Sequence, residues 1–253
     1  MSSLFTTFLL QPILNLLIWL YNVLPGHDIG FAIIVVTFIV KLILYPLTQA
    51  QLKQQRALQQ LQPKIEEVRA RLKDDKEGQA RELMALYSKE KVNPAASCLP
   101  LLIQLPVFIA LYRALSIGLT SGTFDNLLYS FVANPQMVNA KFLGVFDLVH
   151  PSYVLAVLAG AVQFLQTRQM LKPPAGAIAP PPPEVAGKPG AKDEGMAAMM
   201  NKQMMYMMPI LTIVIGFSLP GGLSLYWLTM SLLTVAQQHW TLKKPTAALV
   251  PTV

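Results

Sequence analysis

The sequence is poor in charge, because Lys, Arg, Asp and Glu together make up only 13% of its residues. Soluble globular domains carry about twice that share. Hydrophobic residues account for 53%, and the mean hydropathy is +0.45. This balance excludes an ordinary soluble domain and predicts an integral membrane protein.

Cysteine and histidine are scarce as well. Cys98 is the only cysteine, which excludes an internal disulfide and a cysteine-based metal cluster. The histidines His27, His150 and His239 lie far apart in the sequence, each near the end of a predicted span. We therefore expect no metal, no cofactor and no catalytic triad, and we expect that the protein is not an enzyme.

Lys and Arg are absent from Met1 to Gly30, which excludes an ordinary signal peptide because that segment needs a basic start. Residues Leu4 to Leu24 are long enough to span a bilayer. Polar residues nevertheless recur among them at helical spacing: Thr7, Gln11, Asn15 and Asn22. We favour residues 1–28 as an amphipathic helix that lies in the membrane interface, with a true span as the alternative.

Five further segments are long and apolar enough to approach a membrane span, which takes about 20 residues. They predict an all-α integral membrane protein with five transmembrane helices. The expected order is span 29–48, cytoplasmic helical hairpin 49–97, span 98–116, extracytoplasmic loop 117–151, span 152–171, cytoplasmic Pro-rich linker 172–203, span 204–219, span 222–240 and cytoplasmic tail 241–253.

The orientation follows from the basic residues. Ten of the twenty Lys and Arg lie between Gln49 and Ser97, whereas the loop 117–151 contains only Lys141. The positive-inside rule places the basic loops and the C-terminus in the cytoplasm and the N-terminus outside. An odd number of spans agrees with that arrangement.

Residues 49–97 have the pattern of an antiparallel helical hairpin. A seam at three- and four-residue spacing predicts a helix that packs on a partner, with Leu58, Leu61, Ile65, Val68 and Leu72. Asp74, Asp75 and Gly78 interrupt the seam, and the second helix has an apolar side with Ala80, Leu83, Met84 and Tyr87. Pro63 should kink the first helix. A solvated charged linker would explain the charges but not the seam.

Two compositional features lie near the fourth span. The linker contains KPPAGAIAPPPPEVAGKPG, which cannot bury a core and predicts an extended, disordered segment. Seven of the twelve methionines follow in GMAAMMNKQMMYMM. Methionine is common on surfaces that bind varied apolar segments, so we expect a client entrance at Met204, Met205, Met207 and Met208. A helix start that is merely rich in methionine is the alternative.

Polar residues gather in the cytoplasmic halves of several spans, and a lysine at the centre of a membrane helix costs about 2.5–3.5 kcal/mol. Lys41 shares one helical face with Thr37, Tyr45 and Thr48. The other spans contribute Gln104, Gln163, Gln166, Thr167, Trp227, Ser231, Thr234 and Gln238. Their common depth predicts a hydrophilic groove that opens to the cytoplasm and is closed outside.

Simpler explanations exist for the single residues. Lys41 is close enough to the cytoplasmic headgroups for its ammonium to snorkel toward them. Glutamines in membrane helices often only hydrogen-bond a neighbouring helix. Arg113, near the outer end of its span, is best explained as a snorkelling anchor.

Four stretches resemble the YidC-type membrane protein insertases, a bacterial family with relatives in mitochondria and chloroplasts. They are FIVKLILYPLTQAQLKQQRALQQLQPKI, MALYSKEKVNPAASCLPLLIQLPVFIALYRAL, the region of the third span, and LPGGLSLYWLTMSLLTVAQQ. The resemblance implies five helices around a groove that is open to the cytoplasm and to lipid.

The resemblance also implies roles for individual residues. Lys41 matches a basic residue that receives acidic or polar parts of a client, and Gln163 and Trp227 match positions that line the groove. The family usually has arginine where this chain has Lys41; lysine keeps the charge but loses the planar five-donor fork. The second and fourth spans resemble the apolar slide along which a client helix enters lipid.

The resemblance implies nascent membrane proteins and the lipid bilayer as partners. The hairpin, with ten basic and seven acidic residues, is the expected contact for the ribosome, and the Sec translocon is a further candidate; no DNA partner is expected. Some family members carry an extra N-terminal span and a large periplasmic domain, or a lipoprotein signal, and neither is expected here. The alternatives are a scaffold for membrane complexes and, less favoured, a small-solute transporter.

Overall fold

The computed structural model describes residues 3–93, 99–121, 124, 127–135, 137–171 and 205–243. Helices dominate this part of the chain, in agreement with the predicted all-α class. Cys98, the Pro-rich linker 172–203, Met204 and the tail from residue 244 onward lie outside the described residues.

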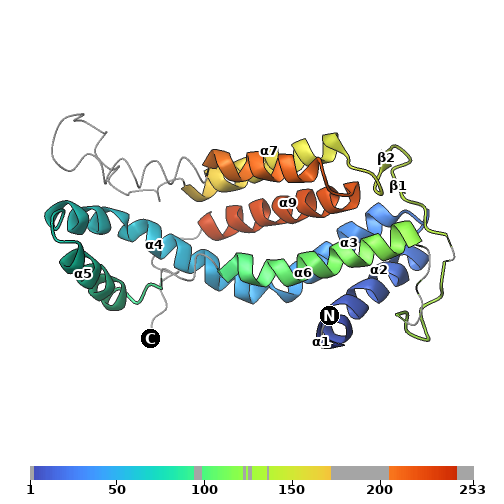
Figure 1. The fold of residues 1–253 in the computed structure, drawn as a ribbon, viewed down its shortest axis with the longest axis horizontal. Coiled ribbons are helices and arrows are strands. Elements are labelled where there is room, and N and C mark those ends of the chain that lie inside the picture. Colours follow the sequence, from blue (N-terminus) through green and yellow to red (C-terminus); the bar gives the residue numbers. More distant parts are fainter. Residues whose placement is uncertain are drawn as a thin grey trace.

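Two groups of helices lie side by side along the long axis of the molecule (Figure 1). One consists of α2 (Gln11–Val23), α3 (Ile29–Ile43) and α6 (Leu99–Ser116). The other consists of α7 (Tyr153–Leu171), α9 (Gly221–Lys243) and the helix Met205–Gly216. The main apolar core includes Ile33, Leu115 and Leu223, so it joins α3, α6 and α9.

The N-terminal helix packs against the rest of the molecule. It follows α1 (Ser3–Phe5) and the π-helix η1 (Thr6–Leu10), and its residues Leu14, Leu17 and Ile18 are fully buried. The amide of Asn15 donates to the Leu127 carbonyl at 2.8 Å. Asn15, one residue of the predicted polar stripe, therefore has its hydrogen-bond partner in the loop between α6 and α7.

The first predicted span ends in a sharp bend. Helix α3 and the following helix α4 (Tyr45–Arg71) meet at an angle of 66° around Leu44. Pro46 lies in the first turn of α4, where it lacks an N–H group and disfavours helical backbone at the residue before it. The predicted span 29–48 is thus divided between two helices.

Helix α4 continues through Pro63 and is followed by α5 (Lys76–Lys89), which folds back along it (Figure 1). Leu61 and Ile65 of the predicted seam are buried and pack against Leu83, Leu86 and Tyr87. The assignment of Ala80 and Met84 to this side was wrong, since both are exposed, Met84 to 68%. Exposed ion pairs such as Lys64 with Glu90 add little stability, because water screens them.

The loop between α6 and α7 contains a short β-hairpin, which the all-α prediction missed. After the π-helix η3 (Ile117–Ser121), strands β1 (Lys141–Phe142) and β2 (Phe146–Asp147) pair antiparallel. Past β2, the N–H of Gly221 donates to the His150 carbonyl at 2.9 Å, and that of Gly222 donates to the Leu148 carbonyl at 3.0 Å. The loop therefore covers the start of α9, and residues 122–152 are called the capping loop below.

Among the described residues, one stretch, Thr6–Val23, is long and apolar enough to cross a bilayer alone. The bent pair of α3 and α4 meets the same criterion together, while Gln104–Leu119 and Met205–Gly216 are shorter apolar helices. Large apolar side chains are exposed along α3, α6, α7 and the helix Met205–Gly216, which is the surface expected of helices in contact with lipid.

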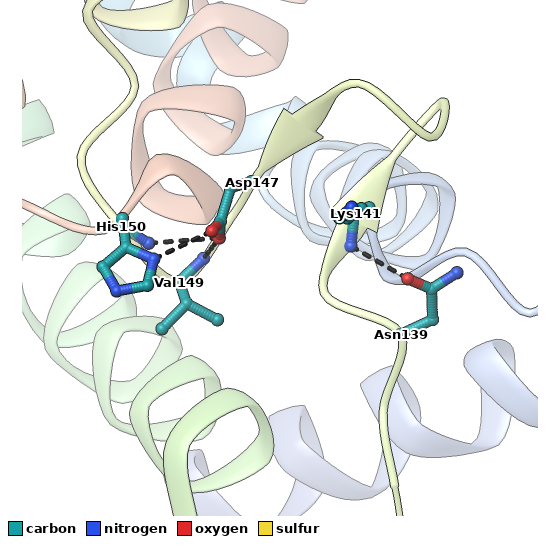
Figure 2. Close-up of polar contacts among 5 residues, drawn as sticks. All are labelled: Asn139, Lys141, Asp147, Val149 and His150. Atoms are coloured by element: carbon teal, nitrogen blue, oxygen red, sulfur yellow. Dashed lines mark hydrogen bonds and ion pairs between the residues drawn. The ribbon is translucent and has the colours of Figure 1, made fainter.

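Asp147 organises the end of the capping loop (Figure 2). Its carboxylate is 2.8 Å from Nδ1 of His150 and accepts the N–H of Val149 at 2.8 Å and that of His150 at 3.3 Å. The hydrogen bond from the His150 side chain, together with these backbone bonds, holds the pKa of Asp147 below its usual 3.8.

A depressed carboxylate pKa adds stability that is present above the unfolded value of about 3.9 and is lost as the pH falls through the folded value. We expect Asp147→Asn to lower the stability at pH 7 by about 1 kcal/mol or less, as for an exposed pair. The difference from wild type should shrink as the pH falls below about 4. Thermal unfolding of purified protein across this range measures it. Asp74→Asn, at an exposed position, should show no such change, and a deficit that persists at low pH would contradict the role of the charge.

Candidate functional site

A line of polar contacts joins α9 to α3 and α4. Three side-chain pairs form this polar seam: Lys41 with Thr234, Thr48 with Gln237, and Gln49 with Thr241. The Nζ atom of Lys41, the Nε2 atom of Gln237 and the Nε2 atom of Gln49 each donate to the hydroxyl of their partner at 3.0 Å. Residues 234, 237 and 241 recur at three- and four-residue spacing, so they lie on one face of α9.

Lys41 and Thr234 form the pair of the polar seam that lies nearest to the N-terminal end of α9. The hydroxyl of Thr234 donates its own proton to the Met230 carbonyl at 2.7 Å, so its lone pairs are free to accept from the ammonium of Lys41. No carboxylate in the described part of the chain forms an ion pair with Lys41. The site thus presents a half-buried positive charge that a neutral hydroxyl orients but does not neutralise.

The other two residues of the predicted Lys41 face behave differently from each other. Thr37 is fully buried and donates to the Ile33 carbonyl of its own helix at 2.6 Å. Tyr45 is 45% exposed, and its hydroxyl accepts from Gln49 at 2.7 Å. Tyr45 therefore extends the polar seam, whereas Thr37 offers no free polar group to a ligand.

The predicted glutamines bond to partners outside the seam. Gln104 donates to the hydroxyl of Tyr226, which is 1% exposed, and so links α6 to α9. Gln163 accepts from the hydroxyl of Thr212, which links α7 to the helix Met205–Gly216. No hydrogen bond among the described residues joins Lys41, Gln104 and Gln163 to one another. Both glutamines thus make the interhelical contacts that sequence alone offered as the simpler alternative.

Trp227 stacks on Phe108 of α6, with ring centroids 5.2 Å apart and planes at 11°. Ser231 lies one turn further along α9 and is half-buried. Trp227, Ser231 and Thr234 follow one another at four- and three-residue spacing, so one helical face runs from the aromatic stack to the partner of Lys41.

The stack can be tested by substitution. Trp227→Leu should lower stability by about 0.5–1.5 kcal/mol beyond the loss of buried area, because the ring pair is lost. Trp227→Phe should recover part of that loss. Thermal unfolding of the purified variants measures both. Trp240→Leu, at a position that is 71% exposed, is the matched control and should change stability little; equal stability of Trp227→Leu and wild type would contradict a structural role of the stack.

The described methionines of the expected entrance lie at the start of the helix Met205–Gly216. Met207 is 49% exposed and Met208 is 45% exposed, while Met205 is half-buried. Between this helix and α7 lies an apolar pocket of about 430 Å³, whose lining includes Val157, Leu165 and Ile210. The pocket and the exposed methionines form an apolar surface that shares no residue with the polar seam.

Sequence reasoning missed three residues of the seam, namely Gln49, Gln237 and Thr241. It named Gln238 as the next member of the α9 stripe, yet the amide of Gln238 donates to the sulfur of Met170 on α7 at 3.4 Å. The repetition of polar residues on both sides of the bend at Leu44 was a usable signal, because a bent pair can face a single straight helix along its length.

Comparison with known proteins places this geometry in context. The sequence model of the family described as 60Kd inner membrane protein matches residues 19–248. A protein of Fusobacterium nucleatum named Membrane protein insertase YidC is 36% identical over 217 residues, which cover 86% of this chain and 87% of that protein. Proteins of the same name from Mannheimia succiniciproducens and Actinobacillus pleuropneumoniae are 37% and 35% identical and are covered over only 35% and 36% of their length. The chain thus spans about a third of these two relatives.

Proposed function

The chain belongs to the 60Kd inner membrane protein family, and from this membership we propose that it is a membrane protein insertase. It moves hydrophobic segments of newly made proteins from the cytoplasm into the bilayer and translocates their short polar flanks. The similarity to the insertase of Fusobacterium nucleatum carries the proposal, because it extends over most of both chains. The same relatives support a location in the bacterial inner membrane and a role that involves no enzymatic step.

We propose the orientation that the basic residues favour, with the N-terminus outside and the C-terminus in the cytoplasm. In that orientation the bend at Leu44 lies at the cytoplasmic membrane surface, and helices α4 and α5 project into the cytoplasm. The capping loop that contains β1 and β2 is then extracytoplasmic.

In this proposal the polar seam forms one wall of the client groove, and Lys41 is its recognition charge. An acidic residue in the flank of a client can accept a hydrogen bond from the ammonium, since within the described part of the chain the neutral Thr234 alone competes for it. Charge-assisted hydrogen bonds contribute about 1.5–3 kcal/mol, which offsets part of the cost of desolvating the client carboxylate. Trp227 and Ser231 continue the wall, while Gln104 and Gln163 tie its helices together.

The apolar part of a client leaves through the exposed faces of α6 and of the helix Met205–Gly216. Met205, Met207 and Met208 receive the segment at the proposed entrance, where flexible side chains adapt to different sequences. Moving the segment into lipid supplies the free energy, because each buried CH₂ group contributes about 0.8 kcal/mol. No nucleotide hydrolysis is required by this scheme.

The expected partners follow from the same arrangement. Nascent membrane proteins and lipid are the substrates and the medium, and the basic surface of α4 and α5 suits a contact with the ribosome. The Sec translocon remains a candidate partner of the apolar faces.

Reconstitution tests the function directly. Purified protein in lipid vesicles should insert a client that has one hydrophobic segment and a short translocated tail, measured by protection of the tail from added protease. Vesicles without the protein should leave the tail exposed. If insertion proceeds equally without the protein while assembly of a multi-subunit membrane complex fails in depleted cells, the scaffold alternative replaces the insertase.

A further inference from the structure

The hairpin formed by β1 and β2 presents an apolar tip to the outside of the molecule. Phe142 is 9% exposed, whereas the tip residues Leu143 and Val145 are 58% and 77% exposed. Between them lies Gly144. An exposed apolar tip is unfavourable in water and indicates a surface that is covered by something else.

The backbone conformation of the tip is unfavourable for leucine. Leu143 has φ 53° and Gly144 has φ 71°, and the N–H of Val145 donates to the Phe142 carbonyl at 3.1 Å. The two left-handed residues and this hydrogen bond are those of a type I′ turn, although Phe142 pairs with Phe146; Asn-Gly or Asp-Gly is strongly preferred at such positions. Leucine at the first central position is strained, so folding alone would favour Asn there. Leu143 thus combines an unfavourable backbone conformation with an exposed apolar side chain.

Two contacts hold the tip at the level of the first turn of α3. The carboxylate of Asp28 accepts the N–H of Gly30 at 2.7 Å, as the cap of α3, and the N–H of Leu143 at 2.8 Å. The ring of Phe142 packs so closely on Gly30 that a Cβ atom there would lie 2.2 Å from the ring. The hairpin thus lies beside the N-terminal end of α3, which is the outer end of that helix in the proposed orientation, on which this inference rests.

The tip also continues an exposed apolar face of α3. Phe31, Phe38 and Leu42 of α3 are 42%, 47% and 54% exposed and recur at spacings of seven and four residues, which is one helical face. Phe142 contacts Phe31 edge to face, with ring centroids 5.5 Å apart. The exposed Lys141 beside the tip suits the phosphates of lipid headgroups.

We propose that the tip Leu143–Gly144–Val145 inserts into the leaflet at the N-terminal end of α3 and anchors the capping loop to the membrane surface. The occupant of this apolar surface is lipid. The anchor keeps the loop that caps α9 at a constant depth, and so closes the end of the helix bundle opposite to the bend at Leu44.

A depth measurement tests the anchor. In full-length protein with Cys98 replaced by serine, an environment-sensitive fluorophore is attached to Val145→Cys, and the protein is reconstituted in vesicles of phosphatidylethanolamine and phosphatidylglycerol. Phe38→Cys serves as the lipid-facing control, and Ser130→Cys, at an exposed position of the same loop, serves as the aqueous control. We expect the probe at 145 to be quenched by lipids with a nitroxide high on the acyl chain and to be shielded from aqueous iodide.

A second variant separates insertion from folding of the hairpin. Leu143→Asn keeps, and should improve, the turn geometry while it removes the apolar side chain, so the probe at 145 should shift toward the behaviour of the probe at 130. The proposal is overturned if the probe at 145 behaves like the one at 130 in the wild-type tip, or if Leu143→Asn leaves its lipid quenching unchanged. Shielding from iodide only after addition of a soluble extract, without lipid quenching, would instead assign the tip to a protein partner.

Discussion

Lys41→Glu is expected to reduce insertion of clients with acidic translocated flanks by about tenfold to a hundredfold. The estimate follows from losing a charge-assisted hydrogen bond of about 1.5–3 kcal/mol, since each 1.4 kcal/mol changes an equilibrium tenfold. Lys41→Ala loses the same hydrogen bond without adding repulsion, so it should lie near the tenfold end of this range and Lys41→Glu near the hundredfold end. Lys41→Arg should be tolerated, because it preserves the charge and adds donors. Protease protection of the client tail in vesicles measures all three.

Two controls make this result specific. Lys89→Glu introduces the same charge change at an exposed position of α5 and, in vesicles that contain no ribosome, should leave insertion near the wild-type level. A client with a neutral flank should be inserted almost equally by wild type and Lys41→Glu. If the acidic client is also inserted equally by both proteins, Lys41 has no electrostatic role, and snorkelling toward the headgroups becomes the better explanation.

Gly221→Ala is expected to destabilise the protein by about 3 kcal/mol, at the upper end of the usual range for overpacking. A Cβ atom at Gly221 would lie 2.6 Å from the carbonyl oxygen of Asp147 and 3.1 Å from that of His150. Both neighbours are backbone atoms, and the N–H of Gly221 already donates to one of them, so the contact cannot relax by a rotamer change. The melting temperature of the purified protein should fall by roughly 6 °C or more.

Gly118→Ala is the matched control for this substitution. A Cβ atom there would meet only Phe124 at 3.8 Å and Ile18 at 4.0 Å, which are ordinary contacts. Because alanine is favoured over glycine within a helix, this variant should be as stable as wild type or slightly more stable. Similar melting temperatures for the two variants would show that the capping loop yields to the start of α9 and does not restrain it.

The sequence predicted the helical class and the seam of the α4–α5 hairpin, because both depend on local periodicity. The division of the first span was also readable in hindsight, since Pro46 disfavours a continuous helix at that point. The short β-hairpin was not predicted, because two-residue strands leave too few positions for an alternating pattern.

The pairing of polar side chains could be predicted only in part. Periodicity grouped Lys41 with Thr48, and both contact α9, but it could not say which faces meet. Gln237 and Gln238 illustrate the limit: they are neighbours in sequence, yet one donates to Thr48 and the other to Met170. Successive residues in a helix differ by about 100° in direction, so an uncertainty of one residue redirects a side chain to another helix.

Because of the bend at Leu44, a small change in the angle between α3 and α4 would produce a larger displacement at the far end of α4. The helix contains 27 residues, so at about 1.5 Å per residue it is roughly 40 Å long. A change of about 5° in the bend would move its far end by about 3–4 Å at that length. Leu44 lies about one helical turn from Lys41, between the charge that would receive a client and the helix that would meet a ribosome. In the proposed orientation, a small tilt at the membrane surface would therefore be amplified at the tip of the hairpin.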